Sequence, residues 1–69
     1  MHRYLVIIEE ADGNYSAISP DLPGCVATGQ TREETEERMR EAIAFHLDGH
    51  REDGIPVPDA RTYAAYIAV

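Results

Sequence analysis

The sequence is poor in the residues that usually reinforce a small domain. Cys25 is the only cysteine among 69 residues, which excludes a disulfide within the chain and a Cys/His cluster of the zinc-finger type. A chain this short buries only about 60% of the surface that it exposes when unfolded, so disulfides, metals or oligomerisation usually supplement its core. Because the first two are missing, we expect self-association or a permanent partner protein.

Positive charge and long hydrophobic runs are also scarce. Thirteen acidic residues stand against six basic residues, all arginine, and the net charge is −7. Such a chain repels phosphate backbones, so we expect no direct nucleic-acid binding, and a basic protein is its natural complement. The first apolar run, residues 4–8, is too short for a secretion signal or a membrane span. We therefore expect a cytoplasmic protein that makes no membrane contact, which suits a lone reduced thiol.

A single helix, predicted over residues 31–53, organises the rest of the chain. Thr31 and Glu34 have the spacing of a capping box at its start. Gly54 is preferred to Gly49 as its end, because two prolines follow Gly54 and would block any continuation. One apolar stripe repeats at about 100° per residue, as in a helix that lies on a core; it consists of Thr35, Met39, Ala42, Ile43, His46 and Leu47.

Four strands are predicted around this helix, over residues 3–9, 15–19, 25–28 and 61–69. An Asp-Gly signal joins the first two as a hairpin, and the helix forms a right-handed crossover to the fourth strand. The first and last strands are apolar on both faces, which places them at the centre of the sheet. The expected fold is α+β with the order β-β-β-α-β: one domain over residues 1–69, in which one helix packs on a four-stranded mixed sheet of order 3-2-1-4.

One helix covers only one face of such a sheet. The other face holds either Leu5 and Ile7 or Tyr4, Val6 and Ile8, and it must be buried against another chain. The sequence therefore predicts a domain that associates, most simply as a two-fold homodimer or as a tetramer.

Three motifs resemble the HicB-like antitoxin family. They are residues 19–25 (Ser-Pro-Asp-Leu-Pro-Gly-Cys), residues 29–31 (Gly-Gln-Thr) at the opening of an acidic helix, and residues 52–58 (Glu-Asp-Gly-Ile-Pro-Val-Pro). Their order and spacing match the family, and the resemblance covers nearly the whole chain. It implies a partial ribonuclease H-like fold and a role in a type II toxin–antitoxin pair. The antitoxin would bind a small, basic HicA-type toxin that degrades mRNA, and would cover its active site.

The sequence departs from the family in one respect. Full-length members carry a C-terminal DNA-binding segment that represses their own operon, whereas the last predicted strand here runs to Val69. We therefore expect neither a C-terminal DNA-binding segment nor DNA-binding autoregulation.

Tyr15, Asp21, Leu22 and Phe45 are the candidate partner contacts. Tyr15 lies on the returning strand of the hairpin. Asp21 and Leu22 stand in a loop made rigid by two prolines, whose tip is either an interaction surface or a turn that tucks Leu22 into the core. Phe45 lies off the helix stripe, so it is either covered by the sheet edge or exposed to a partner.

Catalytic and metal-binding interpretations are weaker. His46 and His50 have metal-ligand spacing but no apparent third ligand, and Cys25 is more simply a buried thiol than a nucleophile. The carboxylates that a metal-dependent nuclease would need are more simply solvated turn residues: Glu9, Glu10, Asp12 and Asp21. We expect a non-enzymatic protein without a cofactor or metal. Two alternatives stay open: a stand-alone, self-associating binding module without a toxin partner and, more remotely, a metal-dependent nuclease.

Overall fold

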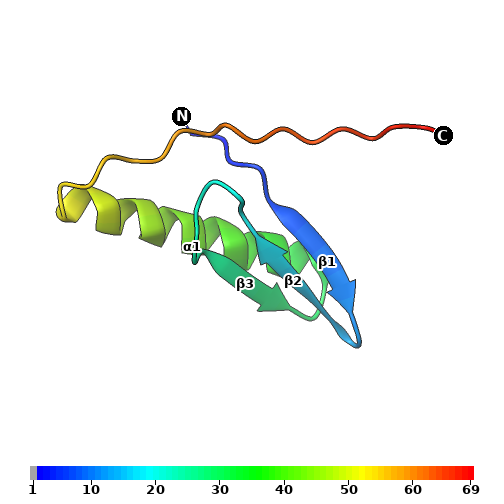
Figure 1. Ribbon diagram of the computed structural model, residues 1–69. Helices are drawn as coiled ribbons and strands as arrows, with labels where there is room; N and C mark the ends of the chain where they lie inside the picture. Colours follow the sequence, from blue (N-terminus) through cyan, green and yellow to red (C-terminus); the bar gives the residue numbers. More distant parts are fainter. Residues whose placement is uncertain (1) are drawn as a thin grey trace.

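The computed structural model describes residues 2–69 and builds them into three strands and one helix. The elements are β1 (Ile7–Ala11), β2 (Asn14–Ile18), β3 (Val26–Gly29) and α1 (Arg32–Glu52). The strands form an antiparallel sheet in the order β1-β2-β3, and α1 covers one face of it (Figure 1). After α1 the chain returns past the N-terminal segment and ends in an extended stretch that projects from the body of the molecule.

The β1–β2 hairpin sets the register of the sheet. Gly13 has a φ of 78°, a left-handed conformation that glycine adopts readily in tight hairpin turns. The resulting register aligns Ile8 with Ala17 and Ala17 with Ala27. These three residues belong to the hydrophobic core or pack against it, so this row faces α1. Because side chains alternate along a strand, the neighbouring row points to the opposite face.

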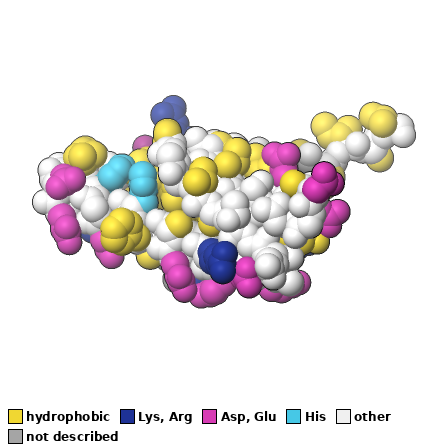
Figure 2. All heavy atoms as spheres, turned by 90° about the horizontal axis from the view of Figure 1, so that it is seen from below, with side chains coloured by type: hydrophobic (Ala, Val, Ile, Leu, Met, Phe, Trp, Pro, Cys, Tyr) yellow, Lys and Arg dark blue, Asp and Glu magenta, His cyan; other side chains and the backbone are white. Residues whose placement is uncertain are grey.

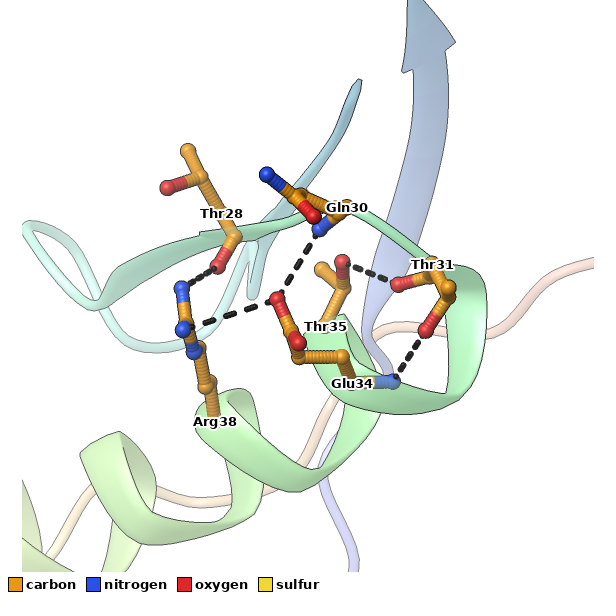
Figure 3. A network of polar contacts seen from close by, with 6 residues as sticks. All are labelled: Thr28, Gln30, Thr31, Glu34, Thr35 and Arg38. Carbon is orange, nitrogen blue, oxygen red and sulfur yellow. Dashed lines mark hydrogen bonds and ion pairs between the residues drawn. The ribbon is translucent and has the colours of Figure 1, made fainter. Parts of the chain in front are cut away.

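Polar contacts from the preceding loop fix the start of α1 (Figure 3). The Thr31 hydroxyl oxygen accepts a hydrogen bond of 3.0 Å from the Glu34 N–H, and the Glu34 carboxylate accepts one of 3.0 Å from the Gln30 N–H. Arg38 donates to the Thr28 carbonyl oxygen at 3.0 Å and so ties the helix to β3. The predicted cap at Thr31 is confirmed, although Glu34 bonds to Gln30 rather than to the N–H of Thr31 itself.

The helix ends where the sequence predicts. Gly54 has a φ of 69°, and its N–H donates to the Arg51 carbonyl at 3.2 Å. The Ile55 N–H donates to the His50 carbonyl at 2.8 Å. This pair of bonds is the Schellman arrangement that closes a helix at a left-handed glycine. The preference for Gly54 over Gly49 as the helix end is therefore confirmed.

The core lies between α1 and the inner face of the sheet. Its buried hydrophobic residues come from β2, the β2–β3 loop and the helix: Ala17, Leu22, Cys25, Met39 and Leu47. The predicted helix stripe is confirmed, because Thr35, Met39 and Leu47 are buried while Ala42 and Ile43 pack against the core.

The predicted four-stranded sheet is wrong, because the sheet has three strands. Within residues 2–69 no strand follows α1, so residues 61–69 are extended but unpaired and the order 3-2-1-4 does not form. Two contacts position the returning chain. The Tyr4 hydroxyl donates to the Pro58 carbonyl, and Asp21 accepts hydrogen bonds from the N–H groups of Arg61 and Thr62. Beyond Thr62 the chain leaves the body of the molecule instead of completing the sheet.

The first strand also differs from its predicted bounds of residues 3–9. β1 begins only at Ile7, whose partner is Ile18, the last residue of β2. Continuing the ladder would bring Leu5 opposite Pro20, and proline has no N–H to donate. Instead, the Ser19 hydroxyl donates to the Leu5 carbonyl at 2.8 Å. The N-terminal stretch is thus held to the body by side chains rather than by strand pairing.

Candidate functional site

Three apolar side chains form a continuous row on the sheet face that α1 does not cover. The register aligns Ile7 with Ile18 and Ile18 with Val26, so one residue from each strand contributes. The side chains are 40%, 45% and 61% exposed, respectively. We call Ile7, Ile18 and Val26 the outer row. A group of exposed β-branched residues on a sheet is typical of a protein-binding surface.

A second surface, the β1 groove, lies between β1, the face of α1 and the C-terminal segment. Its volume is about 880 Å³. Apolar side chains from both layers line it, among them Leu5, Ile8, Met39 and Ile43, together with charged side chains of β1 and α1 and with residues 64–66 of the C-terminal segment. β1 is an edge strand, and the backbone edge that faces away from β2 carries no strand partner within residues 2–69. Such an edge can accept a further strand.

Tyr15 borders this groove and is held by a carboxylate. Tyr15 pairs with Glu10 across the two strands, and its hydroxyl donates to the Glu10 carboxylate at 2.8 Å. This hydrogen bond and the negative charge of Glu10 raise the pKa of the Tyr15 hydroxyl. Tyr15 is one of the residues that line the groove.

Asp21 anchors the C-terminal segment. Its carboxylate accepts hydrogen bonds from the Arg61 N–H (2.9 Å), the Thr62 N–H (3.0 Å) and the Thr62 hydroxyl (2.7 Å). The Thr62 hydroxyl and the Arg61 N–H hold the pKa of this carboxyl below its ordinary value. Sequence reasoning missed this role, because the partners are 40 and 41 residues apart and no local pattern connects them.

The other two candidate contacts lie in very different environments. Leu22 is fully buried in the core, so of the two alternatives for the loop tip the structure shows the one that tucks Leu22 inside. Phe45 is 82% exposed on α1 and is not covered by the sheet edge. The four candidates do not form one cluster: Tyr15 lies at the groove, Asp21 at the base of the C-terminal segment and Phe45 on the helix surface.

The side chains considered for catalysis or metal binding do not converge. Among residues 2–69, no three His, Cys, Asp or Glu side chains are placed to hold a metal ion together. The rings of His46 and His50 lie 4.6 Å apart between centroids, and Nδ1 of His50 is buried without a hydrogen-bond partner. Cys25 is buried, and burial raises the pKa of its thiol. A raised pKa opposes thiolate formation, the reverse of what an activated nucleophile needs.

Negative charge dominates the surface. Figure 2 shows Asp and Glu side chains along one rim of the molecule and around one end, with the C-terminal segment projecting at the other. Three arginines pair with carboxylates on their own helix, at 3.1–3.5 Å: Arg38 with Glu34, Arg40 with Glu37 and Arg51 with Asp48. Three of the six arginines are thus paired with carboxylates of the same helix. Within the described residues, no helix is long and apolar enough to cross a membrane.

Relatives of this chain occur in bacteria, archaea and a phage. A protein of Haemophilus phage HP1, named "Uncharacterized 14.9 kDa protein in rep-hol intergenic region", is 36% identical over 64 residues, which cover 93% of this chain and 48% of that protein. The chain thus spans about half the length of this phage relative. A UPF0150 protein of Synechocystis is 37% identical over 59 residues (84% of this chain, 75% of that protein). A UPF0150 protein of Archaeoglobus fulgidus is 38% identical over 55 residues (75% and 80%).

The family assignment follows from a match along nearly the whole chain. The sequence profile described as "HicB_like antitoxin of bacterial toxin-antitoxin system" matches residues 4–69. The match includes the loop, helix and C-terminal stretch that carry the motifs at residues 19–25, 29–31 and 52–58. This chain therefore belongs to the HicB-like antitoxin family.

Proposed function

We propose that this chain is an antitoxin that binds a small, basic HicA-type toxin and prevents it from degrading mRNA. The match of residues 4–69 to the antitoxin family carries this proposal. Two properties of the molecule support it: a net charge of −7 and the exposed outer row of Ile7, Ile18 and Val26. The protein would act in the cytoplasm, where mRNA is degraded, and by binding rather than by catalysis.

Charge and apolar contact have separate roles in this proposal. Negative potential over the surface attracts a basic partner and raises the association rate, an effect that salt screens. Burial of apolar side chains then slows dissociation, because roughly 25 cal/mol are gained for each Å² of apolar surface removed from water. The outer row offers three such side chains, and Phe45 is an exposed aromatic side chain on a different surface, that of α1.

Self-association is a further part of the proposal. One helix covers one face of the sheet, and the extended C-terminal segment lies outside the body of the molecule. A homodimer or a tetramer would remove the remaining apolar surface from water.

Growth of cells that express the toxin tests the proposal. The toxin to be tested would be a small basic protein encoded next to the gene for this chain, and it should arrest growth unless this chain is co-expressed. The double substitution Ile18→Asp and Val26→Asp should abolish the rescue. Ala44→Asp is the matched control, since it adds a carboxylate at an exposed position of α1 and should preserve the rescue.

Two results would contradict the proposal. If the unmodified chain fails to restore growth although both proteins are present, the chain does not neutralise this toxin. Equal rescue by the outer-row double variant and by Ala44→Asp would place the toxin contact on another surface.

A further inference from the structure

The C-terminal segment, residues 61–69, has the composition of a buried strand but no partner. After Arg61 it contains no charged residue. Its large apolar side chains, Tyr63, Tyr66, Ile67 and Val69, are all at least 79% exposed. The segment is extended and outside the sheet, and Figure 2 shows hydrophobic side chains on the part that projects from the body.

The β1 groove has the complementary features. It has a volume of about 880 Å³. Apolar side chains, among them Leu5, Ile8, Met39 and Ile43, line it together with charged side chains of β1 and α1. The backbone edge of β1 next to it is unpaired within residues 2–69. A strand placed there would gain backbone hydrogen bonds from β1 and would pack one set of alternating side chains against α1.

The anchors at the start of the segment hold it beside its own groove, but the segment does not pair with β1 there. Asp21 holds both Arg61 and Thr62, and the Tyr4 hydroxyl holds Pro58. Residues 64–66 line the outer part of the groove without forming a strand of the sheet, and the end of the chain projects from the molecule. The seven residues after Thr62 span roughly 23 Å when extended, which is long enough to lie along β1 and its N-terminal approach in another molecule.

The exposed area indicates a partner of the size of a second copy. The chain exposes 5581 Å², whereas a compact monomer of 7.7 kDa exposes roughly 4,300 Å². The excess is on the order of 1,300 Å² for each copy, and two copies together exceed the roughly 1,600 Å² that a standard interface buries in total. A pair of such chains therefore has enough surplus surface to form a stable dimer.

We propose that two copies of this chain exchange their C-terminal segments, each segment adding as a strand to the free edge of β1 in the other copy. The exchange is reciprocal about a two-fold axis, so each groove is filled and each segment is buried. This inference rests on the self-association included in the proposed function and does not depend on toxin binding. A second copy is favoured over a toxin as the occupant, because each copy carries one segment and one groove. The residues after Arg61 are uncharged and suit the apolar part of the groove lining.

Nuclear magnetic resonance on mixed samples tests the exchange in the intact chain. A nitroxide is attached to Val69→Cys in a Cys25→Ala background, and this unlabelled chain is mixed with ¹⁵N-labelled chain that carries no nitroxide. Broadening of ¹⁵N signals then reports only contacts between chains. We expect broadening along β1 and at Met39 and Ile43. A nitroxide at Ala44→Cys, an exposed helix position outside the groove, should leave the β1 signals sharp.

Sedimentation equilibrium supplies the second readout. The unmodified chain should have the mass of two chains, and the double substitution Tyr66→Asp and Ile67→Asp should reduce it to the mass of one. Phe45→Asp is the matched control, because Phe45 is equally apolar and exposed but lies outside the segment and the groove; this variant should stay dimeric. Circular dichroism should show that both aspartate variants retain α1, since Phe45, Tyr66 and Ile67 are outside the core.

The possible failures are distinguishable. A one-chain mass for the unmodified protein, with no rise on concentration, would overturn both the exchange and the proposed self-association. A two-chain mass that survives Tyr66→Asp with Ile67→Asp, or broadening confined to β2 and β3 at Ile18 and Val26, would overturn the exchange and leave self-association in place. If the segment binds β1 only after a toxin is added, the occupant is the toxin complex and the exchange is also overturned.

Discussion

At the scale of single residues, the junction between β3 and α1 depends on the absence of one side chain. A Cβ atom on Gly29 would lie 2.6 Å from Oγ1 of Thr35 and 3.0 Å from its backbone nitrogen. The Thr35 hydroxyl already makes a hydrogen bond, which it donates to the Thr31 carbonyl at 2.7 Å (Figure 3). Thr35 is fully buried and cannot move aside without breaking this bond. Only glycine allows the strand to approach the first turn of the helix so closely.

Alanine substitutions at two glycines should therefore have opposite effects on stability. Gly29→Ala should lower the free energy of unfolding by about 1–3 kcal/mol, the usual cost of overpacking. Gly49→Ala should raise it by about 0.5–1 kcal/mol, because Gly49 lies within α1 with open space around it and alanine is the better helix former. Urea denaturation of both variants gives the comparison. Equal stabilities would show that the close contact at Thr35 relaxes without cost.

Asp21 makes the position of the C-terminal segment dependent on pH. Its hydrogen bonds with Thr62 and Arg61 lower the pKa of the folded carboxyl, so ionised Asp21 stabilises the anchored state. This contribution is fully present above the unfolded pKa of about 3.9 and is lost as the pH falls through the lower folded pKa.

The backbone order of Arg61 and Thr62, measured by ¹⁵N relaxation, should thus be constant above the ordinary aspartate pKa and fall only in more acidic solution. Asp21→Ala, which removes all three acceptor contacts, should lower this order at every pH. Loss of order at a pH above the ordinary aspartate value would contradict the assigned hydrogen bonds.

At the scale of elements, the helix is the part that the sequence specifies best. Its beginning and end are set by neighbours in the chain: Thr31 and Glu34 at one end, Gly54 at the other. Its buried stripe follows from periodicity alone. Such signals are local, so they can be read without knowing the rest of the fold.

Non-local features could not be read in this way. The apolar residues of the segment 61–69 favour a strand, but the segment is unpaired in the structure, because strand pairing also depends on which backbone edge the folded chain offers. The anchoring of Arg61 and Thr62 by Asp21 and the alignment of Ile7, Ile18 and Val26 into one row likewise depend on tertiary structure. For Leu22 the sequence was compatible with both a buried and an exposed position, and the structure shows that the side chain is buried.

Truncation of the helix stripe should be far more costly than truncation of its charged side. Met39 is fully buried in the core, whereas Glu41 is exposed. Met39→Ala should lower the free energy of unfolding by about 2–5 kcal/mol, a large fraction of the stability of a small domain. Glu41→Ala should change it by no more than about 0.5 kcal/mol. Similar melting temperatures for the two variants would mean that the helix presents another face to the sheet.

At the scale of the whole molecule, the proposed functions depend on two surface properties, negative charge and exposed apolar side chains. Negative charge is spread over the exterior, and apolar side chains are exposed on the outer row and on the C-terminal segment. The proposed functions divide between them: the outer row for the toxin, the segment and the β1 groove for a second copy. If both proposals hold, a small chain without disulfides would gain stability through the same contacts by which it associates.

Salt should separate the electrostatic and apolar contributions to toxin binding. Raising the ionic strength should lower the association rate steeply, because it screens the attraction between an acidic chain and a basic partner. The dissociation rate should change little with salt and should rise in the variant Ile18→Asp with Val26→Asp. Stopped-flow or surface-based kinetics at several salt concentrations measure both rates. An association rate independent of salt would show that net charge does not guide this encounter.

The most direct measurement is the RNA cleavage rate of the purified toxin as this chain is added. The account predicts that cleavage falls in proportion to the added chain and stops at a fixed stoichiometry of chain to toxin. The outer-row double variant should leave cleavage unaffected at the same concentrations, while Ala44→Asp should inhibit as the unmodified chain does. Undiminished cleavage in the presence of excess, folded, unmodified chain would contradict the account.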